Sequence, residues 1–468
     1  MGTNNRARRA VKKAKRDRKR RAADAGWPAG AHPGSPDGMP AGPHGPGCTC
    51  PWPDAFGHRD RAGTGMPSNE IGQVFDAAVV AALADDAHGA AKLLSDLDEL
   101  ALTRDVDLYV EGELVDVVER AWSSGWQPLD IVQHVRRQAD DRATAFVHDA
   151  IALEAARYAP ATIDGRWAQQ LDELGANSQW WPSDIVLPAA WADKHGLDRV
   201  DVWLTVAAVV GRLRFLPRLR QSLPLPGSAT ARAAAGTAAV DEKMLARVRA
   251  LLAKAESTDF PDEAEALSGK AQELMTKFSL DRVLVELDTG ADGESVGERR
   301  IWIDKPYVTA KAMLVSAAGR ANRCQSVLFE KIGFISVVGD HADLRLVEVL
   351  ATSLLVQANR AMLAQGAQRN AWGQSRTRSY RQSFLVSYAS RIGERLEEGA
   401  EAARAQMVED DRLLPALAAR DAKVEDKFHE LFPDTRPVSV AASNPVGWRD
   451  GRLAADMANL DVRSKLSS

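Results

Sequence analysis

Apolar side chains recur at three- and four-residue spacing in two neighbouring stretches in the middle of the chain, residues 241–257 and 261–280. This spacing places them on one face of a helix with 3.6 residues per turn. The first stretch carries Met244, Leu245, Val248, Leu251, Leu252 and Ala255, and the second carries Leu267, Ala271, Leu274, Met275 and Phe278. Pro261 suits the first position of the second helix, where its missing N–H costs nothing. The pattern predicts a helical hairpin over 241–280 that needs a further partner to bury both apolar faces.

The same stretch resembles a known family. KMLARVRALLAKAEST followed by PDEAEALSGKAQELMTKFSL is similar to the family called domain of unknown function 2786, found in actinobacteria and their phages. The resemblance extends more loosely through residues 299–460, and residues 70–220 resemble the N-terminal part of longer members. The family has no established activity, so the resemblance implies an architecture and no mechanism.

Periodicity and composition divide the rest of the chain. Residues 68–220 carry helical stripes and several tryptophans, and residues 221–240 are rich in Pro, Gly, Ala, Ser and Thr, which is typical of a linker. Residues 281–465 mix strand-like and helix-like patterns. We therefore expect a mainly α protein: a helical N-terminal domain, the hairpin, and an α+β C-terminal domain with a small mixed or antiparallel sheet on long helices.

Within the C-terminal domain the elements follow from local signals. We expect Asp288–Glu298 to be a polar loop, with helices at Val308–Ala321 and from His341 onward, where Asp340 is a good N-cap and Asp343 falls at the third helical position. Strands are predicted at 300–303, 324–330 and 333–338, the last two joined by a turn at 331–332.

Overall composition excludes few classes of function. With 45% hydrophobic and 26% charged residues the chain is ordinary for a globular protein, and its three cysteines indicate no disulfide framework. No apolar run reaches the roughly 20 residues of a membrane span, and the N-terminus lacks the apolar core of a secretory signal. A soluble cytoplasmic protein with no membrane partner is expected.

Charge is unevenly distributed. Residues 1–24 carry eleven Lys and Arg and two Asp, so this tail holds +9 while the whole chain holds −4. The basic residues that we assign to a possible nucleic-acid contact are Lys12, Lys13, Lys15, Arg16, Arg18, Lys19 and Arg20. Such a block binds nucleic acid or an anionic surface, or folds back on its own acidic body.

A Pro- and Gly-rich linker follows the tail, so residues 1–67 form no core of their own. Within it His44, Cys48, Cys50 and His58 supply four nitrogen and sulfur ligands of the kind that zinc binds. Their spacing is not that of a standard zinc finger, so incidental cysteines in a linker are the preferred interpretation. We therefore predict no cofactor, with zinc as the alternative.

The strongest candidate binding residues lie at the start of a predicted helix whose core residues recur every four positions from Tyr380 to Leu396. Arg376, Arg378 and Arg381 sit at its N-terminal end, where cations oppose the helix dipole. A bound phosphate would offset this cost, with Ser379 adding a hydroxyl donor. The other interpretation, which we slightly prefer, is that carboxylates of the acidic body pair with the three arginines.

Several sequence motifs of common enzyme classes are missing: there is no H-E-x-x-H, G-x-x-x-x-G-K-[ST] or G-x-G-x-x-G. Catalysis is left open, because active sites also assemble from distant residues. The preferred hypothesis is a non-catalytic nucleic-acid-associated or phosphate-binding protein. The alternatives are an enzyme of unrecognised type acting on a nucleic-acid or phosphorylated substrate, and a scaffold for protein partners that the sequence does not identify.

Overall fold

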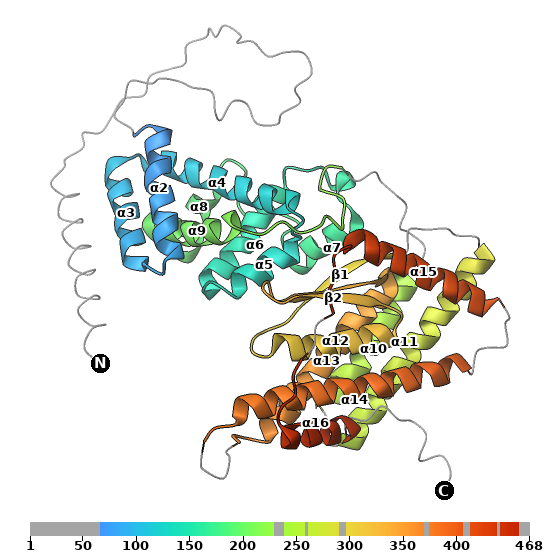
Figure 1. The fold of residues 1–468 in the computed structure, drawn as a ribbon. Coiled ribbons are helices and arrows are strands. Elements are labelled where there is room, and N and C mark those ends of the chain that lie inside the picture. The colour runs from blue at the N-terminus through green and yellow to red at the C-terminus, as the bar shows by residue number, and fades with distance from the viewer. Residues whose placement is uncertain are drawn as a thin grey trace, which may run out of the picture. The chain divides into compact units, whose positions relative to one another are not determined.

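A computed structural model describes residues 66–228, 238–257, 261–289, 296–368, 374–405, 412–437 and 440–457. All of them belong to one compact unit, Thr64–Ser468. The basic residues between Lys12 and Arg20, and the His44, Cys48, Cys50 and His58 set, lie outside the described residues. The described chain is mainly helical with a small antiparallel sheet, which confirms the expected fold class (Figure 1).

The first part of the described chain is entirely helical. Its elements are α2 (Ser68–Leu83), α3 (Ala87–Leu100), α4 (Thr103–Ser123), α5 (Pro128–Arg136), α6 (Asp141–Ala155), the 3₁₀ turn η1 (Pro160–Thr162), α7 (Gly165–Glu173), α8 (Leu187–His195) and α9 (Arg199–Arg214). They enclose one hydrophobic cluster in which Trp122, Trp126, Trp167 and Trp203 are almost completely buried. Large aromatic side chains thus serve as packing anchors in this part of the protein.

The predicted hairpin is present as α10 (Ala238–Ser257) and α11 (Pro261–Thr289), and α11 begins at Pro261 as expected. Leu245, Val248, Ala271 and Met275 from the two stripes are buried in a second hydrophobic cluster together with the helices that follow. The second helix runs nine residues beyond the predicted end at Leu280, because its apolar face continues through Val283.

The sheet has three antiparallel strands in the order β1-β3-β2: β1 (Val296–Trp302), β2 (Gln325–Phe329) and β3 (Phe334–Asp340). Both strands of the predicted hairpin and its turn are confirmed. The expected polar loop Asp288–Glu298 is wrong at both ends, because α11 continues to Thr289 and β1 already begins at Val296, which pairs with Asp340. The polar residues 298–300 are therefore part of a strand.

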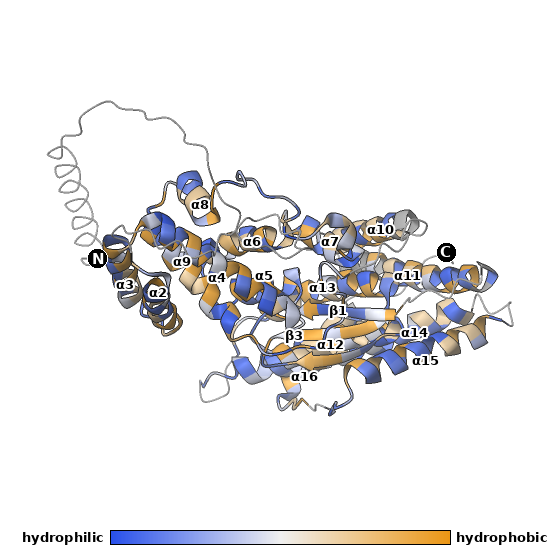
Figure 2. Cartoon of the chain, turned by 90° about the horizontal axis from the view of Figure 1, so that it is seen from above, coloured by the Kyte–Doolittle hydropathy of each residue, from blue (hydrophilic) through white to orange (hydrophobic). Residues whose placement is uncertain are grey.

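Alternation along the strands directs side chains to two faces. On one face Ile301, Ile335 and Val337 join the hydrophobic cluster of α12 (Val308–Ala321) and α13 (His341–Ala364). On the other face Val296 and Val338 pack against α15 (Leu413–Leu431). In Figure 2, hydrophilic residues (blue) and hydrophobic residues (orange) both occur along α11, α14 and α15, as expected of amphipathic helices.

By length and composition α13 would suffice to cross a membrane. Its position in the fold is that of a core helix, because Leu346, Val347, Leu350 and Leu354 are buried in the second hydrophobic cluster. A core helix of this length passes the same compositional test as a membrane span.

Two further helices complete the described chain, α14 (Thr377–Ala405) and α16 (Pro445–Met457). The predicted core stripe of α14 is confirmed, because Tyr380, Phe384, Tyr388, Ile392 and Leu396 are each at most 1% exposed. Figure 1 shows α14 and α16 side by side.

Candidate functional site

Close contacts between α14 and α16 fix their relative direction. Gly447 lies against the backbone of Tyr380 and Gly451 against that of Phe384, and a Cβ atom at either glycine would meet the facing carbonyl oxygen far inside van der Waals distance. Both contacts advance in the same sense along the two helices, so the helices are parallel. Their N-termini therefore lie at the same end of the pair.

The N-terminus of α16 is tied to α14 by hydrogen bonds. The Asn444 side chain accepts from Gly447 N at 2.9 Å and so caps the helix, while Asn444 N donates to Ser383 Oγ at 3.0 Å. One turn further along, Ser387 Oγ donates to the carbonyl oxygen of Trp448. At the opposite end of α16, Arg395 Nη1 donates to the carbonyl oxygen of Asp456 at 3.1 Å, a favourable place for a cation.

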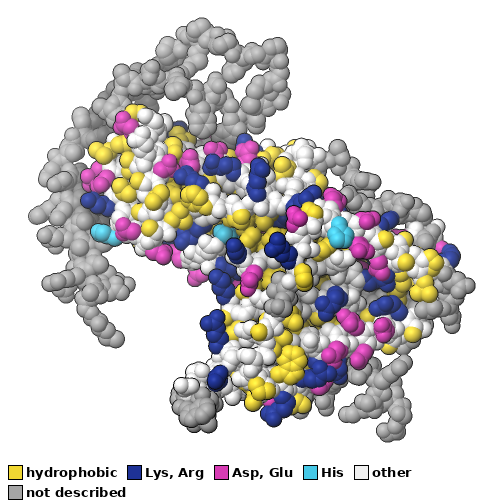
Figure 3. All heavy atoms as spheres, in the orientation of Figure 1, with side chains coloured by type: hydrophobic (Ala, Val, Ile, Leu, Met, Phe, Trp, Pro, Cys, Tyr) yellow, Lys and Arg dark blue, Asp and Glu magenta, His cyan; other side chains and the backbone are white. Residues whose placement is uncertain are grey.

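A groove of about 600 Å³ opens where the two N-termini meet. It is lined by Gln374, Ser375, Arg376, Arg378, Ser379, Gln382, Ala441 and Ser443. Gln382 Nε2 donates to the carbonyl oxygen of Ala441 at 3.1 Å and so joins its two sides. Figure 3 shows Lys and Arg side chains among apolar and acidic ones over α14 and α16 on the face that it presents.

The structure brings together Arg376, Arg378 and Ser379 of the predicted phosphate site. Arg376 and Arg378 are exposed, and neither forms an ion pair with the described part of the chain. The expected alternative, neutralisation by carboxylates of the acidic body, is thus not seen for these two residues among the described ranges. Ser379 Oγ donates to the carbonyl oxygen of Arg376 at 3.0 Å, which fixes the entry to the helix.

Arg381 occupies a different position. It is absent from the residues that line the groove, and it is partly buried. Its Nε atom is buried and has no hydrogen-bond partner within the described part of the chain. Because 100° separates successive residues on a helix, Arg381 lies on the other side of Arg378 from Gln382. The predicted cluster of three arginines is therefore split, with two arginines on the groove.

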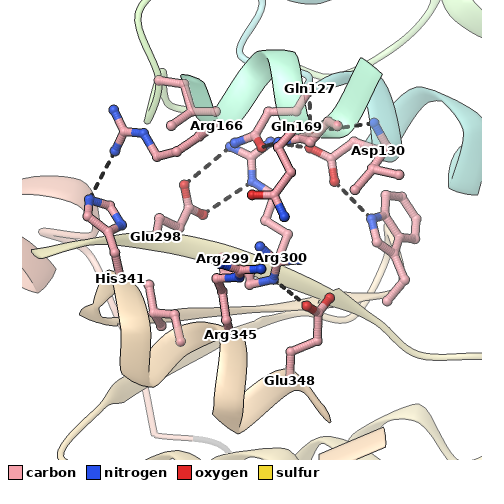
Figure 4. A pocket seen from close by; sticks show the side chains of 15 residues that line it. Gln127, Asp130, Arg166, Gln169, Glu298, Arg299, Arg300, His341, Arg345 and Glu348 are labelled. Atoms are coloured by element: carbon pink, nitrogen blue, oxygen red, sulfur yellow. Dashed lines mark hydrogen bonds and ion pairs between the residues drawn. The ribbon is translucent and has the colours of Figure 1, made fainter. Parts of the chain in front are cut away.

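A second polar site, which the sequence did not reveal, lies between the helical part and the sheet (Figure 4). Its centre is the buried guanidinium of Arg300 on β1. Nη1 of Arg300 donates to the Asp130 carboxylate and to the carbonyl oxygen of Gly125, both at 2.7 Å. Nη2 donates to the carbonyl oxygen of Arg220 at 3.1 Å, and Nε donates to Glu298 at 3.2 Å. Burial by itself would lower the pKa of Arg300, but the charges of Asp130 and Glu298 and their hydrogen bonds together outweigh it and raise that pKa.

Asp130 reaches this position because it is the third residue of α5. Its Oδ2 accepts from Gln127 N at 3.2 Å, one half of a capping box, while its Oδ1 accepts from Trp302 Nε1 at 2.8 Å. One carboxylate thus caps a helix of the first part and binds two side chains of β1. The helix N-terminus favours its negative charge.

A cavity beside this cluster contains further arginines. Arg166 of α7 binds Asp164 through Nε and Nη2, and its Nη1 contacts His341 Nε2 at 3.1 Å. A guanidinium has no acceptor, so Nε2 of His341 must be the acceptor of this bond. On the neighbouring side Arg299 pairs with Glu348. Figure 4 shows Arg166 facing His341, and Gln169 near Arg299.

A buried carboxylate pair lies near the start of α13. Asp340 is the N-cap as predicted and accepts from Ala342 N at 3.0 Å. The Asp343 carboxylate accepts from Ser279 Oγ at 3.1 Å, and Arg420 of α15 lies between the two carboxylates, 2.5 Å from Asp340 and 3.7 Å from Asp343. Burial raises the pKa of Asp343 to about 6, and the charge of nearby Asp340 acts in the same direction.

No group of three or more His, Cys, Asp or Glu residues suited to a metal is found among the residues that the structure describes. The His44, Cys48, Cys50 and His58 set lies outside those residues and stays a prediction.

Residues 243–282 match the model of the family described as "Protein of unknown function (DUF2786)". This match covers the helical hairpin on which the resemblance was based. No curated protein matches the chain. No solved structure matches it.

Proposed function

We propose that this protein binds nucleic acid without catalysis, through the groove between the N-termini of α14 and α16. The observation that carries the proposal is the pair Arg376 and Arg378, exposed on the groove wall and without an ion pair in the described chain. Phosphate oxygens accept hydrogen bonds from guanidinium groups and from the backbone N–H groups at a helix N-terminus, so they suit this groove.

The chemistry of the groove supports binding in preference to catalysis. Its lining contains amides, hydroxyls and arginines, and among the described residues that line it there is no His, Cys, Asp or Glu. General acid–base catalysis needs a group of that kind within reach of the substrate. In this proposal the basic tail between Lys12 and Arg20 adds an attraction to nucleic acid that is independent of base sequence. We also propose that the protein acts in the cytoplasm.

The test is fluorescence anisotropy with labelled single- and double-stranded DNA and RNA at two salt concentrations. The intact chain is compared with a chain lacking residues 1–24 and with the double variant Arg376→Ala/Arg378→Ala. The control is Arg320→Ala/Arg412→Ala, which removes the same charge from two exposed sites that are more than 60% accessible.

We expect the groove variant to bind more weakly and to lose about one unit of salt slope for each lost phosphate contact, while the control keeps both. Arg381→Ala should have little effect, because Arg381 does not line the groove. Equal weakening in the groove and control variants would reduce the effect to net charge. Binding lost only with residues 1–24 would move the site to the tail, and no binding by any variant would refute the proposal.

A further inference from the structure

We propose that the cavity between α7, β1 and α13 is a binding site for a small oxyanion, separate from the groove at α14. The cavity measures about 100 Å³ and is lined by residues of both the helical part and the sheet. The argued residues are Arg166 and Gln169 on α7, Arg299 on β1, and His341 and Arg345 on α13 (Figure 4).

Two of these arginines have donors to offer. Within the described chain Arg299 binds Glu348 through Nε, and Arg345 binds Glu242 through Nη2 at 2.6 Å. Each guanidinium has five N–H groups, so four on each remain for a ligand. Their side chains are only 27% and 23% exposed, which limits access of water to these donors.

Each carboxylate on the cavity wall already has its own partner, and one of them, Glu348, is the partner of Arg299 Nε. Asp130 and Glu298 are occupied by Arg300, Trp302 and Ser336. Arg345's partner, Glu242, is not among the lining residues. Arg299 and Arg345 are thus each neutralised by one carboxylate, and an anion would bind the N–H groups that this pairing leaves.

Size and shape limit the ligand. A dry cavity of about 150 Å³ accommodates benzene, so the smaller volume here suits an ion with a few heavy atoms. The planar fork of arginine matches the oxygens of phosphate or carboxylate. The His341 ring fixes one wall, because it packs so closely on Gly297 of β1 that no Cβ atom would fit there.

The experiment is isothermal titration of the intact protein with inorganic phosphate and, separately, with acetate. One variant is Arg299→Gln/Arg345→Gln, which removes both donors' charges. Another is Gln169→Glu, which keeps the size of the side chain but places a negative charge at the cavity. Arg136→Gln is the matched control, because this 50% exposed arginine lies outside the lining. Circular dichroism checks that each variant is folded.

We expect phosphate or acetate to bind the native protein, the control and the Arg376→Ala/Arg378→Ala variant equally. Affinity should fall about tenfold or more in each cavity variant, since a charge-assisted hydrogen bond contributes about 1.5–3 kcal/mol. Binding of acetate alone would assign the site to carboxylates. No binding of either ion, or binding that survives in both cavity variants, would overturn the proposal. Loss in the Arg376→Ala/Arg378→Ala variant alone would place the ion in the groove and leave the proposal for the cavity refuted.

Discussion

Arg300 Nη1 lies 2.7 Å from the Asp130 carboxylate, and both side chains are only 4% exposed. This pair joins β1 to α5, so one strand of the sheet is fastened to the helical part by a buried charge. Arg300→Ala would leave Asp130 and Glu298 buried without their cation, which costs about 3–5 kcal/mol of unfolding free energy. Urea denaturation followed by circular dichroism measures the loss.

The control for this prediction is Arg136→Ala, because Arg136 forms an ion pair with Asp304 in which both side chains are at least half exposed. We expect a change within about 0.5 kcal/mol there. Similar losses of unfolding free energy in both variants would show that the buried Arg300 cluster contributes no more to stability than an exposed ion pair.

The contact between α16 and α14 depends on the absence of a side chain at Gly451, which faces the carbonyl oxygen of Phe384. Gly451→Ala should cost about 1–3 kcal/mol, because the two helices must move apart. Gly399→Ala in α14 has open space around its Cβ and should stabilise the protein by about 0.5–1 kcal/mol. Thermal or urea unfolding compares the two. Gly451→Ala should also weaken nucleic-acid binding. If the Gly451→Ala variant were as stable as the native chain, the close contact between α16 and α14 would be refuted.

His134 makes stability depend on pH in one direction. Burial lowers its pKa to about 4, below the ordinary value of 6.5. Between these values the unfolded chain binds a proton that the folded chain does not, so stability is present above pH 6.5 and falls toward pH 4. The contribution is about 3 kcal/mol. His134→Gln should flatten this part of the curve of unfolding free energy against pH, and an unchanged slope would contradict the prediction.

Asp343 makes stability depend on pH in the opposite direction. Its pKa of about 6 lies above the ordinary value of 3.8, so the folded chain holds a proton that the unfolded chain has lost. Stability from this group is present below about pH 4 and falls as pH rises to 6. Asp343→Asn should remove this fall, because an amide keeps its size and does not titrate in this range. Urea denaturation at pH 4, 5 and 6 measures the slope, and a steeper fall in the variant would refute the assignment.

Local signals in the sequence predicted local structure well. The structure contains the stripes of Leu245 and Met275, the cap at Asp340 and the strand pair before it, each of which depends on neighbouring residues. The start of β1 was missed because Glu298 and Arg300 look like surface residues. Arg300 compensates the charge of Glu298 and is itself bound by Asp130, 170 residues earlier in the chain, and sequence periodicity does not report such a distant partner.

The candidate sites show the same limit. Arg376 and Arg378 were predicted from their place at one helix start, but the second wall of the groove comes from Ala441 and Ser443. The parallel packing that brings this wall close depends on Gly447 and Gly451, which carry no obvious signal in a single sequence. The cavity proposed to bind an oxyanion is lined by five separate segments, so only the folded chain shows it.

The alternation along β1 limits how this protein can vary through evolution. Glu298, Arg300 and Trp302 face the helical part, while Ile301, between two of them, faces α12 and α13. Inserting or deleting one residue inside this strand would exchange the two sets, burying charges in the apolar cluster and removing the connection to α5. Among related chains we therefore expect length changes on either side of Glu298–Trp302 and a constant length within it.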